Sequence, residues 1–544
     1  MPPQRSGSAA PEQGEGSPLL PTAASSSTPA ESGDTRPQRL SVMELISYGV
    51  GHVLNDVCAS MWFSYTLLYM HAVVGMPGTH AGAILMLGQI VDALATPLVG
   101  LIADRPLRIT MLAKFGRRKF CHLIGSLLVI GSFPFIFMPC WVCDVPLAPP
   151  EPNLVEDKTF GPLPSAEAAE EAAMLAAAEA AWWQQILWYS PLVAVFQLGW
   201  AAVQIAHLSL IPDLTASEHG RTELTAVRGN ATSVVFEMNS SYIYRYSMSV
   251  CSSVVVYMIT WSVLHVTRKS PLDQIGPEDA YKFRNIVLIG TALGSVFSLW
   301  FYMGLNEPTS LQARQMEKQN KEEDQQRLLT TTSHKTTAAF FRDPRLYQAA
   351  LLYVSSRLFS TLSQVFVPLY LDESLGEDAE SLALVPLATF LASFAASLAV
   401  KSMNRRCGRM LTYMLGALLC LVSCVWIYLG SGPNYESREI YAVAILLGAG
   451  SSVTLVTSLC ITADLIGDST DSGAAVYSAV TFADKLFNGL AVMLIESLKC
   501  ADRRACPHYY RDVLSLVCGG TVVFGIAVLF TYWRPRTRFF STIL

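Results

Sequence analysis

Twelve long apolar stretches constrain this chain more than any other feature of its sequence. Each one is long enough to cross a bilayer as a helix that rises ~1.5 Å per residue. Backbone groups in lipid need partners within the same segment, so helices are the expected form of every span. The predicted spans cover residues 43–74, 80–104, 120–141, 184–211, 246–267, 283–305, 346–371, 381–402, 410–430, 439–466, 473–498 and 513–533. The sequence therefore predicts an all-α integral membrane protein.

The composition agrees with a membrane protein that is not an enzyme. Only 15% of the 544 residues are charged, against ~25% in soluble proteins, and 51% are hydrophobic. The net charge of -5 gives no reason to expect nucleic acid as a partner. The sequence carries no P-loop, no His-Glu-x-x-His, no Gly-x-Ser-x-Gly and no Gly-x-Gly-x-x-Gly. We therefore expect no catalytic residues, no cofactor and no resident metal.

Polar segments divide the chain into two halves of six spans. Residues 1–40 are rich in Pro, Ser, Gly and Ala, which is typical of a disordered tail and unlike a signal peptide. The charged segment 306–344 separates a first half, residues 41–305, from a second half, residues 345–533. Residues 534–544 form a short second tail.

The distribution of Lys and Arg predicts the orientation of the spans. The loops after spans two and eight are strongly basic, whereas the segments after spans three and seven are acidic. Cytosolic loops carry the excess of Lys and Arg, so both termini are expected in the cytosol and the acidic loops in a lumen or outside. The loops after spans five and eleven also carry several basic residues and fit this rule less well.

The first span carries a polar face near its middle. His52 and Asp56 are four residues apart, and Asn55 lies three residues after His52, so the three share one face of a helix. An aspartate at bilayer depth costs ~2.5–3.5 kcal/mol on insertion scales. This face is therefore expected to point away from lipid, toward water, another helix or a solute.

Further intramembrane polar residues point to a water-filled cleft between the two halves. Five charged residues within spans would together cost on the order of 15 kcal/mol if they were unpaired. They must therefore be paired, hydrated or protonated, and a cleft between two repeated halves allows all three. Beyond the first span, the candidates for binding a solute or a coupling cation are Gln89, Asp92, Gln204, His207, Arg357, Asp484, Lys485 and Asn488.

These charges suit a zwitterionic amino acid. Our hypothesis is that Asp92 or Asp56 faces an ammonium group or a coupling proton, while the fork of Arg357 faces a carboxylate. Histidines titrate near neutrality, so coupling to H+ is chemically available. Structural alternatives remain open, because Asp484 or Lys485 can also hold another helix and His207 can serve as a structural hydrogen-bonding residue.

The twelve cysteines do not form a disulfide framework in a chain of this length. Most of them lie in spans, where a free thiol behaves as a small apolar residue. Cys140 and Cys143 lie at the predicted lumenal end of span three, and Cys500 and Cys506 lie in the last predicted lumenal loop. A disulfide within either pair is compatible with an oxidising lumen.

The loop after span two resembles a family signature. Gly100 with Asp104-Arg105, followed by Gly116-Arg117-Arg118-Lys119, resembles the cytosolic loop motif of the major facilitator superfamily. Gly408-Arg409 resembles a second copy of part of this motif in the other half. The resemblance implies a twelve-helix, two-lobed carrier that works by alternating access, with the motif residues acting in a cytosolic gate.

Other stretches resemble branches of that superfamily. The segment 221–228 and the Asp-bearing first two spans are similar to the cation-coupled sugar symporters. Stretches from residue 41 to 535, including Gly51-His52, Asn55-Asp56 and Asp484-Lys485, resemble vertebrate lysosomal and melanosomal members needed for cysteine import and pigmentation. Residues 229–245 look like an insertion relative to them. The resemblance implies a multi-pass lysosomal and melanosomal cysteine transporter.

Two short segments resemble sorting signals. Glu15 with Leu19-Leu20 and Asp324 with Leu328-Leu329 resemble the acidic dileucine signal that clathrin adaptors bind. We therefore expect clathrin adaptors and membrane lipid as partners of a monomeric carrier. Two alternatives stay open at this point: a proton- or sodium-coupled symporter of a sugar or lipid-like solute, and a membrane scaffold or sensor that transports nothing.

Overall fold

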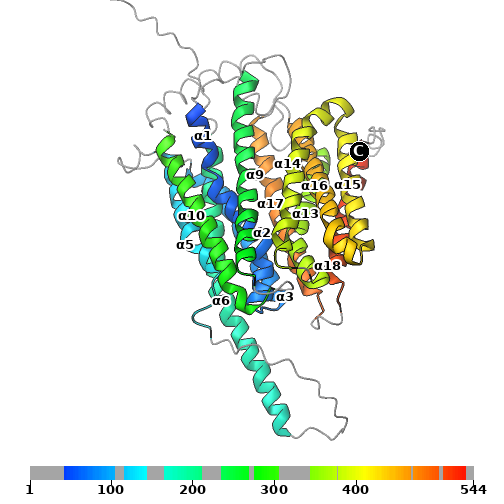
Figure 1. The fold of residues 1–544 in the computed structure, drawn as a ribbon. Helices are drawn as coiled ribbons and strands as arrows, with labels where there is room; N and C mark the ends of the chain where they lie inside the picture. Colours follow the sequence, from blue (N-terminus) through cyan, green and yellow to red (C-terminus); the bar gives the residue numbers. More distant parts are fainter. Residues whose placement is uncertain are drawn as a thin grey trace, which may run out of the picture. The chain divides into compact units, whose positions relative to one another are not determined.

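The computed structural model describes residues 42–103, 116–143, 165–210, 234–268, 275–305, 344–376, 378–466, 470–500 and 506–533. Within these ranges each predicted span coincides with a helix or a run of consecutive helical segments, and no strand occurs. The helices run side by side along a common direction (Figure 1). Nine helices in the described part are long and apolar enough to cross a membrane. The prediction of an all-helical membrane fold is confirmed.

The helices of the first half begin and end close to the predicted spans, with two exceptions. Helices α6 and α9 both start earlier than their spans. The extension of α6 agrees with the Ala- and Glu-rich sequence of residues 165–181, and that of α9 falls in a segment without Pro or Gly to stop a helix. The elements are α1 (Val42–Val50), α2 (Val53–Leu68), η1 (Tyr69–Val73), α3 (Gly78–Ala103), α5 (Arg117–Ile136), α6 (Ser165–Ser209), α9 (Val234–Val266), η2 (Pro277–Asp279) and α10 (Ala280–Gly304).

The second half repeats this order of elements. In both halves the first span ends in a π-helical turn, η1 in one and η3 in the other. Such turns interrupt the regular ladder of backbone hydrogen bonds and are frequent at functional sites. The elements are α13 (Pro344–Leu369), η3 (Tyr370–Leu375), α14 (Ser381–Cys407), α15 (Arg409–Leu429), η4 (Tyr435–Glu439), α16 (Ile440–Ile466), α17 (Thr470–Ser497), α18 (Tyr509–Asp512), η5 (Val513–Val517) and α19 (Cys518–Trp533).

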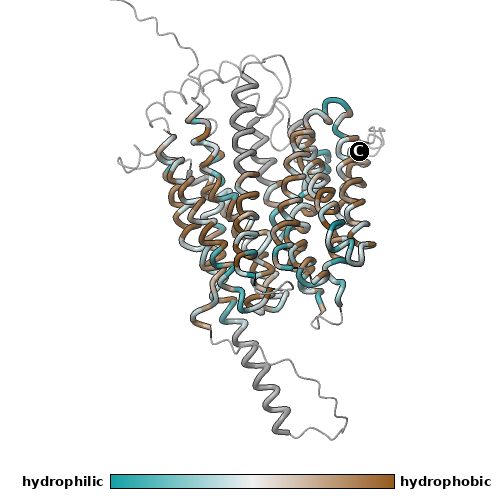
Figure 2. The backbone as a smooth tube through the Cα atoms, in the orientation of Figure 1, coloured by the Kyte–Doolittle hydropathy of each residue, from teal (hydrophilic) through white to brown (hydrophobic). Residues whose placement is uncertain are grey.

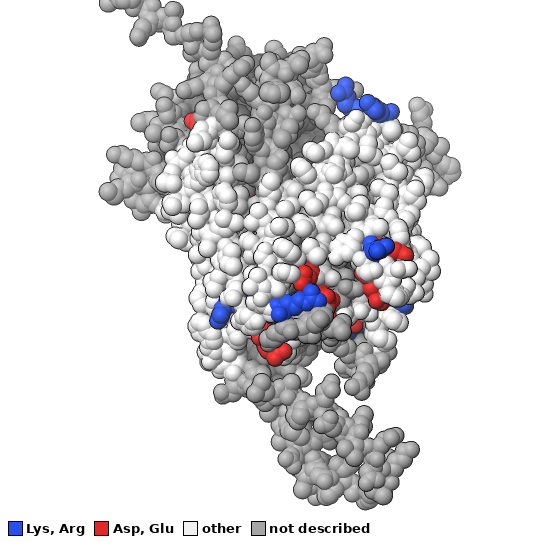
Figure 3. Space-filling model, viewed as in Figure 1, with Lys and Arg blue, Asp and Glu red and all other residues white. Residues whose placement is uncertain are grey.

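Apolar and charged side chains are separated along the helices. Hydrophobic residues dominate the middle of the helices, and hydrophilic residues are more frequent near their ends (Figure 2). On the face drawn in Figure 3, Lys, Arg, Asp and Glu gather toward the ends and leave a broad uncharged band between them. This distribution is the one expected of helices whose middle parts face hydrocarbon.

A pair of matched contacts shows the repeat at the level of single residues. Gly116 precedes α5 with a φ of 100°, and Gly408 precedes α15 with a φ of 80°, a region that favours glycine. Just after these glycines, Arg118 donates a hydrogen bond to the last carbonyl of α6. Arg409 donates to the Cys460 carbonyl in α16 at 2.5 Å. The third span of each half is thereby tied to the fourth at the same end.

Lys119 fixes a further helix end within the first half. Its buried ammonium donates to the carbonyl of Tyr302 at 3.0 Å and to that of Leu305 at 2.6 Å, where α10 ends. A cation at this position also interacts favourably with the negative end of the helix dipole. In the described residues, Arg118 and Lys119 of the predicted gating motif thus contact helix ends of their own half.

In the described part of the chain, the most extensive packing between the two halves involves three pairs of helices. Helix α3 packs on α17, α9 packs on α14, and α2 packs on α13. The polar residues predicted from the sequence lie on α2, α3, α6, α13 and α17. The fold therefore brings spans one and two of the first half against spans seven and eleven of the second half, where most of these residues occur.

Candidate functional site

The first span is broken in the middle, and two histidines bind the carbonyls at the break. Helix α1 ends at Val50 and α2 begins at Val53, with a turn at Gly51 and His52 between them. The Nε2 of His207 lies 2.8 Å from the Tyr48 carbonyl oxygen. The Nε2 of His122 lies 3.0 Å from that of Gly51. An N–H at both positions donates to carbonyls at the end of α1, of which that of Tyr48 also accepts the backbone N–H of Gly51 at 3.1 Å.

His207 thus contacts the backbone at the break, and His122 is a residue that the sequence analysis missed. The Nδ1 of His122 lies 2.7 Å from the hydroxyl of Tyr302, so both of its ring nitrogens have partners. In the sequence His122 stands alone just inside span three, and no spacing relates it to His52 or His207. Only the packing of α5 against the break reveals it.

Replacing His122 with phenylalanine is expected to destabilise the protein. The change leaves the Gly51 carbonyl and the Tyr302 hydroxyl without the imidazole, and a buried polar group without a partner costs about 1–3 kcal/mol. The free energy of unfolding of the purified protein in detergent measures this loss. His80→Phe is the control, because His80 makes ring contacts with Trp182 rather than contacts at the break. Equal stability of the two variants would contradict this role.

The predicted polar face of the first span forms a buried cluster beside the break. The Nδ1 of His52 lies 2.9 Å from Oδ1 of Asp56, one turn further along the chain. Asn55 is 1% exposed. Among the described residues, the Nε2 of His52, the Oδ2 of Asp56 and both amide atoms of Asn55 have no hydrogen-bonding partner. The cluster therefore has the capacity to bind a proton or a small polar species.

The charge on the second span is paired across the two halves. Oδ2 of Asp92 in α3 lies 2.6 Å from the ammonium of Lys485 in α17, and both side chains are buried. The same ammonium donates to the hydroxyl of Thr96 at 3.0 Å. The ammonium of Lys485 therefore takes the position beside Asp92 at which we expected a substrate ammonium. This ion pair joins α3 of the first half to α17 of the second half.

A second ion pair lies within the second half. The Nε of Arg357 in α13 lies 3.3 Å from Oδ2 of Asp484 in α17. The amide of Asn488 donates to the other carboxylate oxygen of Asp484 at 2.7 Å. Asp484 and Lys485 are neighbours in sequence, yet each one binds a different helix. Four of the five intramembrane charges, which we expected to be paired, hydrated or protonated, therefore form two ion pairs.

Arg357 also borders a polar cavity. The cavity has a volume of ≈ 190 Å³ and lies between α13, α14 and α16. The side chain of Arg357 is 32% exposed, whereas that of its partner Asp484 is 5% exposed, so the guanidinium keeps an accessible surface. The polar residues that line the cavity with it are Ser360, Ser363, Gln364, Thr389, Ser393 and Ser451. A cation beside several hydroxyl groups is a suitable environment for a carboxylate.

The remaining predicted binding residues lie apart from this cavity. Gln89 is buried in α3 where that helix packs closely on Gly489 of α17. The side chain of Gln204 accepts a hydrogen bond at 3.2 Å from Trp200 on its own helix, α6. The hydroxyl-bearing residues of the cavity had been missed, because serine and threonine are frequent in spans and their spacing gave no signal.

The structure also places the cysteine pairs and part of the predicted motifs. Disulfides join Cys140 to Cys143 and Cys500 to Cys506. Gly100 lies in α3, and only the backbone of Arg117, at the start of α5, is described. The residues that lie outside the described ranges are Asp104 and Arg105 of the gating motif and Glu15, Leu19, Leu20, Asp324, Leu328 and Leu329 of the sorting signals.

Comparisons with known proteins point to membrane transporters. The family described as MFS/sugar transport protein matches residues 172–534. The major facilitator superfamily domain-containing protein 12 of Homo sapiens is 37% identical over 525 residues, which cover 94% of this chain and 97% of the relative. The protein of the same name from Mus musculus is 38% identical over 521 residues, which cover 93% of this chain and 97% of the relative.

The arrangement of the helices is also similar to that of solved transporters. The crystal structure of a D-xylose-proton symporter matches with a TM-score of 0.58 and covers 91% of this chain and 98% of its own. Its sequence identity is 12%, so this likeness concerns the fold.

Proposed function

Because the chain belongs to the major facilitator superfamily of membrane transporters, we propose that it carries cysteine from the cytosol into the lumen of lysosomes and melanosomes. Cysteine delivered there supplies lumenal cystine stores and melanin synthesis. Alternating access of the two halves to the two sides of the membrane moves the solute, with H+ as the coupling ion. Clathrin adaptors that bind the dileucine segments deliver the protein to these organelles.

The observation that carries this proposal is the cavity beside Arg357. It holds a permanent cation, several hydroxyl groups and the amide of Gln364, and apolar residues such as Phe390 and Val367 complete its wall. Its volume of ≈ 190 Å³ lies below the ~300–1,000 Å³ of pockets that hold drug-sized ligands, so it suits a small solute. The guanidinium binds the carboxylate, the hydroxyl groups bind the ammonium, and the apolar wall receives the thiol side chain.

The His52–Asp56 pair is the proposed site of the coupling proton. It is buried, it lies at a break in a spanning helix, and it has hydrogen-bonding atoms without partners among the described residues. A histidine beside a carboxylate offers atoms that can bind a proton. This assignment replaces the one that gave Asp92 the same role, since Asp92 is paired with Lys485.

Counterflow into proteoliposomes that contain the full chain tests the proposal. Vesicles loaded with unlabelled cysteine should accumulate labelled cysteine, and external cysteine should compete. Cysteamine, which lacks the carboxylate, and xylose should compete poorly. Competition by xylose alone would favour a sugar symporter, and absence of exchange for every solute would favour a scaffold or sensor. Either result would contradict the proposed function.

A further inference from the structure

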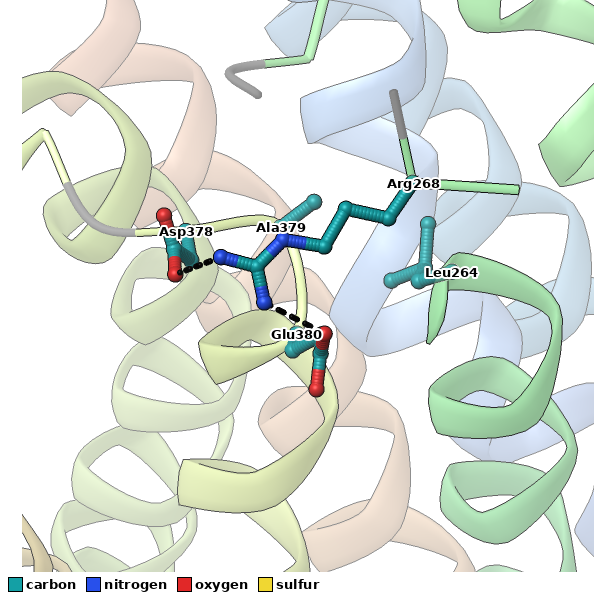
Figure 4. Close-up of a pocket in the computed structure, with 5 residues that line it drawn as sticks. All are labelled: Leu264, Arg268, Asp378, Ala379 and Glu380. Carbon is teal, nitrogen blue, oxygen red and sulfur yellow. Dashed lines mark hydrogen bonds and ion pairs between the residues drawn. The ribbon is translucent and has the colours of Figure 1, made fainter. Parts of the chain in front are cut away.

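Two clusters of charged residues join the halves at one end of the bundle. Both lie where spans one, five, seven and eleven end, which is the end predicted to face the lumen. In the first cluster, Arg268 follows α9 and donates to Asp378 at 2.8 Å and to Glu380 at 2.9 Å (Figure 4). The Nδ1 of His265 lies 3.1 Å from the same oxygen of Glu380. A permanent cation and a histidine of the first half thus share the carboxylates of the second half.

The contacts in the first cluster favour the ionised form of Glu380. Burial acts to raise the pKa of Glu380, but the hydrogen bonds and positive charges of His265 and Arg268 outweigh it and hold this pKa below its usual value of 4.5. The side chain of Glu380 is 16% exposed and that of His265 is 56% exposed. The imidazole therefore remains accessible to protons from the solvent while its partner is sheltered.

The second cluster also combines a histidine of the first half with carboxylates and a cation. The Nε2 of His71, on η1, lies 3.0 Å from Oε1 of Glu373, on η3. Lys499, which follows α17, lies 2.9 Å from both Glu373 and the His71 ring nitrogen. Its ammonium also donates to the hydroxyl of Tyr510, which in turn donates to the buried Glu496 at 3.0 Å. One histidine of the first half therefore faces two carboxylates and one lysine of the second half.

The two clusters share an arrangement of charge. Each holds two carboxylates that belong to the second half, one permanent cation and one histidine that belongs to the first half. In each set the imidazole of the first half contacts a carboxylate of the second half, Glu373 for His71 and Glu380 for His265. A proton on the histidine therefore adds an attraction between the two halves.

Two further charge pairs lie on elements that pack against the clusters. On η2 and α10, which pack against η1 and α9, Asp279 and Lys282 lie 2.9 Å apart. On α18, which packs against η3, Arg511 and Asp512 lie 3.0 Å apart. Lys499 is the opposing group, since its charge repels a proton on His71. The carboxylate of Glu373 lies equally close to that ring nitrogen and counteracts this repulsion.

We propose that His71 and His265 are proton-binding sites that hold the two halves together at the lumenal end when the lumen is acidic. The proposal goes beyond the transport of cysteine. It rests on the proposed function in one respect, namely that this end of the protein faces an acidic lumen. Alternating access requires these contacts to separate in the opposite orientation. An acidic lumen then favours the orientation that faces the cytosol, in which the carrier loads its solute.

The direction of the pH effect follows from linkage. Each histidine contacts a carboxylate of the other half in the closed arrangement and loses this contact when the halves separate, so a proton on the imidazole adds an attraction only in the closed arrangement. A lower pH is therefore expected to favour the closed arrangement, and a higher pH is expected to weaken that preference. The Arg268 contacts do not depend on this proton.

Distance measurements by electron spin resonance on the full chain in lipid nanodiscs test the proposal. Spin labels on a genetically encoded ketone amino acid at Val142 and Ser437, both exposed and near this end of the two halves, leave the native cysteines untouched. Lowering the pH from 7.5 to 5.0 should raise the ratio of the short-distance to the long-distance population. Two partly buried pairs should change this ratio on the order of 3- to 10-fold.

Three variants separate this proposal from other pH effects. The double variant His71→Gln/His265→Gln should lose the pH response, whereas His80→Gln, a histidine near the same end with no ion pair in the described part, should keep it. Arg268→Gln should lower the short-distance population at both pH values. The proposal would be overturned if the distance distribution of the wild-type protein did not change with pH, or if the double variant kept the pH-dependent change. Because no solute is used, these results do not depend on whether cysteine is carried.

Discussion

Replacing Arg357 with glutamine is expected to lower kcat/KM for cysteine uptake by about 10- to 100-fold. A hydrogen bond to a charged group contributes about 1.5–3 kcal/mol, and ~1.4 kcal/mol corresponds to a factor of ten in rate. Glutamine is polar but shorter, and it lacks the charge and the planar fork that binds a carboxylate. Arg357→Lys keeps the charge and should recover part of the activity. Initial rates of labelled cysteine uptake into proteoliposomes measure the effect.

The same substitution also leaves Asp484 without its cation, so a control must separate binding from stability. The side chain of Asp484 is almost fully buried and lies 3.3 Å from Arg357. A buried carboxylate without a cation beside it lowers the free energy of unfolding. The double variant Arg357→Gln/Asp484→Asn removes both charges. It should recover the stability of the wild-type protein while uptake stays low. Recovery of uptake in this double variant would assign Arg357 a purely structural role.

Neutralising one partner of the Asp92–Lys485 pair is expected to be the most destabilising change in the interface. Removing one member of a buried ion pair costs about 3–5 kcal/mol, because the other charge is left in a low-dielectric environment. Both side chains are close to fully buried, and their atoms lie 2.6 Å apart. Asp92→Asn should therefore lower both the free energy of unfolding in detergent and cysteine uptake.

Two further variants show whether the pair is the cause. The double variant Asp92→Asn/Lys485→Gln removes both charges and should regain most of the stability that Asp92→Asn loses. The exchange Asp92→Lys/Lys485→Asp keeps the pair with its direction reversed and should regain part of it. If the single variant Asp92→Asn were as stable as the wild-type protein, the Asp92–Lys485 ion pair would not contribute to holding the halves together.

The number and kind of helices followed from the sequence because lipid leaves few alternatives. An apolar stretch of sufficient length has to form a helix in a bilayer, whatever its neighbours are. The positions of helix ends were less predictable where the chain is helical outside the membrane. Helix α9 begins at Val234 rather than near residue 246, since the intervening sequence has no Pro or Gly to stop it.

The polar residues were identified from the sequence, but their partners were not. Intramembrane charges stand out against an apolar background, so Asp92, Arg357, Asp484 and Lys485 could be selected. Which charge meets which depends on how α3, α13 and α17 pack, and no spacing within one span contains that information. The helical spacing of four correctly brought His52 to Asp56, because that contact lies within one element.

The contacts at the predicted lumenal end were harder to foresee. His71, His265, Glu373 and Lys499 lie close to helix ends, where charged residues are common and carry little information singly. Their importance comes from the approach of η1 to η3 and of α9 to α14. These are pairs of elements more than a hundred residues apart in the chain, so only the folded arrangement brings their charges together.

Uptake of labelled cysteine by isolated lysosomes, with and without this protein, tests the central claim most directly. Cystine and a neutral sugar are measured beside it in the same preparation. We expect uptake of cysteine that depends on the protein and that falls to the background level with Arg357→Gln, and no protein-dependent uptake of the sugar. Equal cysteine uptake in lysosomes that lack the protein, or protein-dependent uptake of the sugar alone, would contradict the claim.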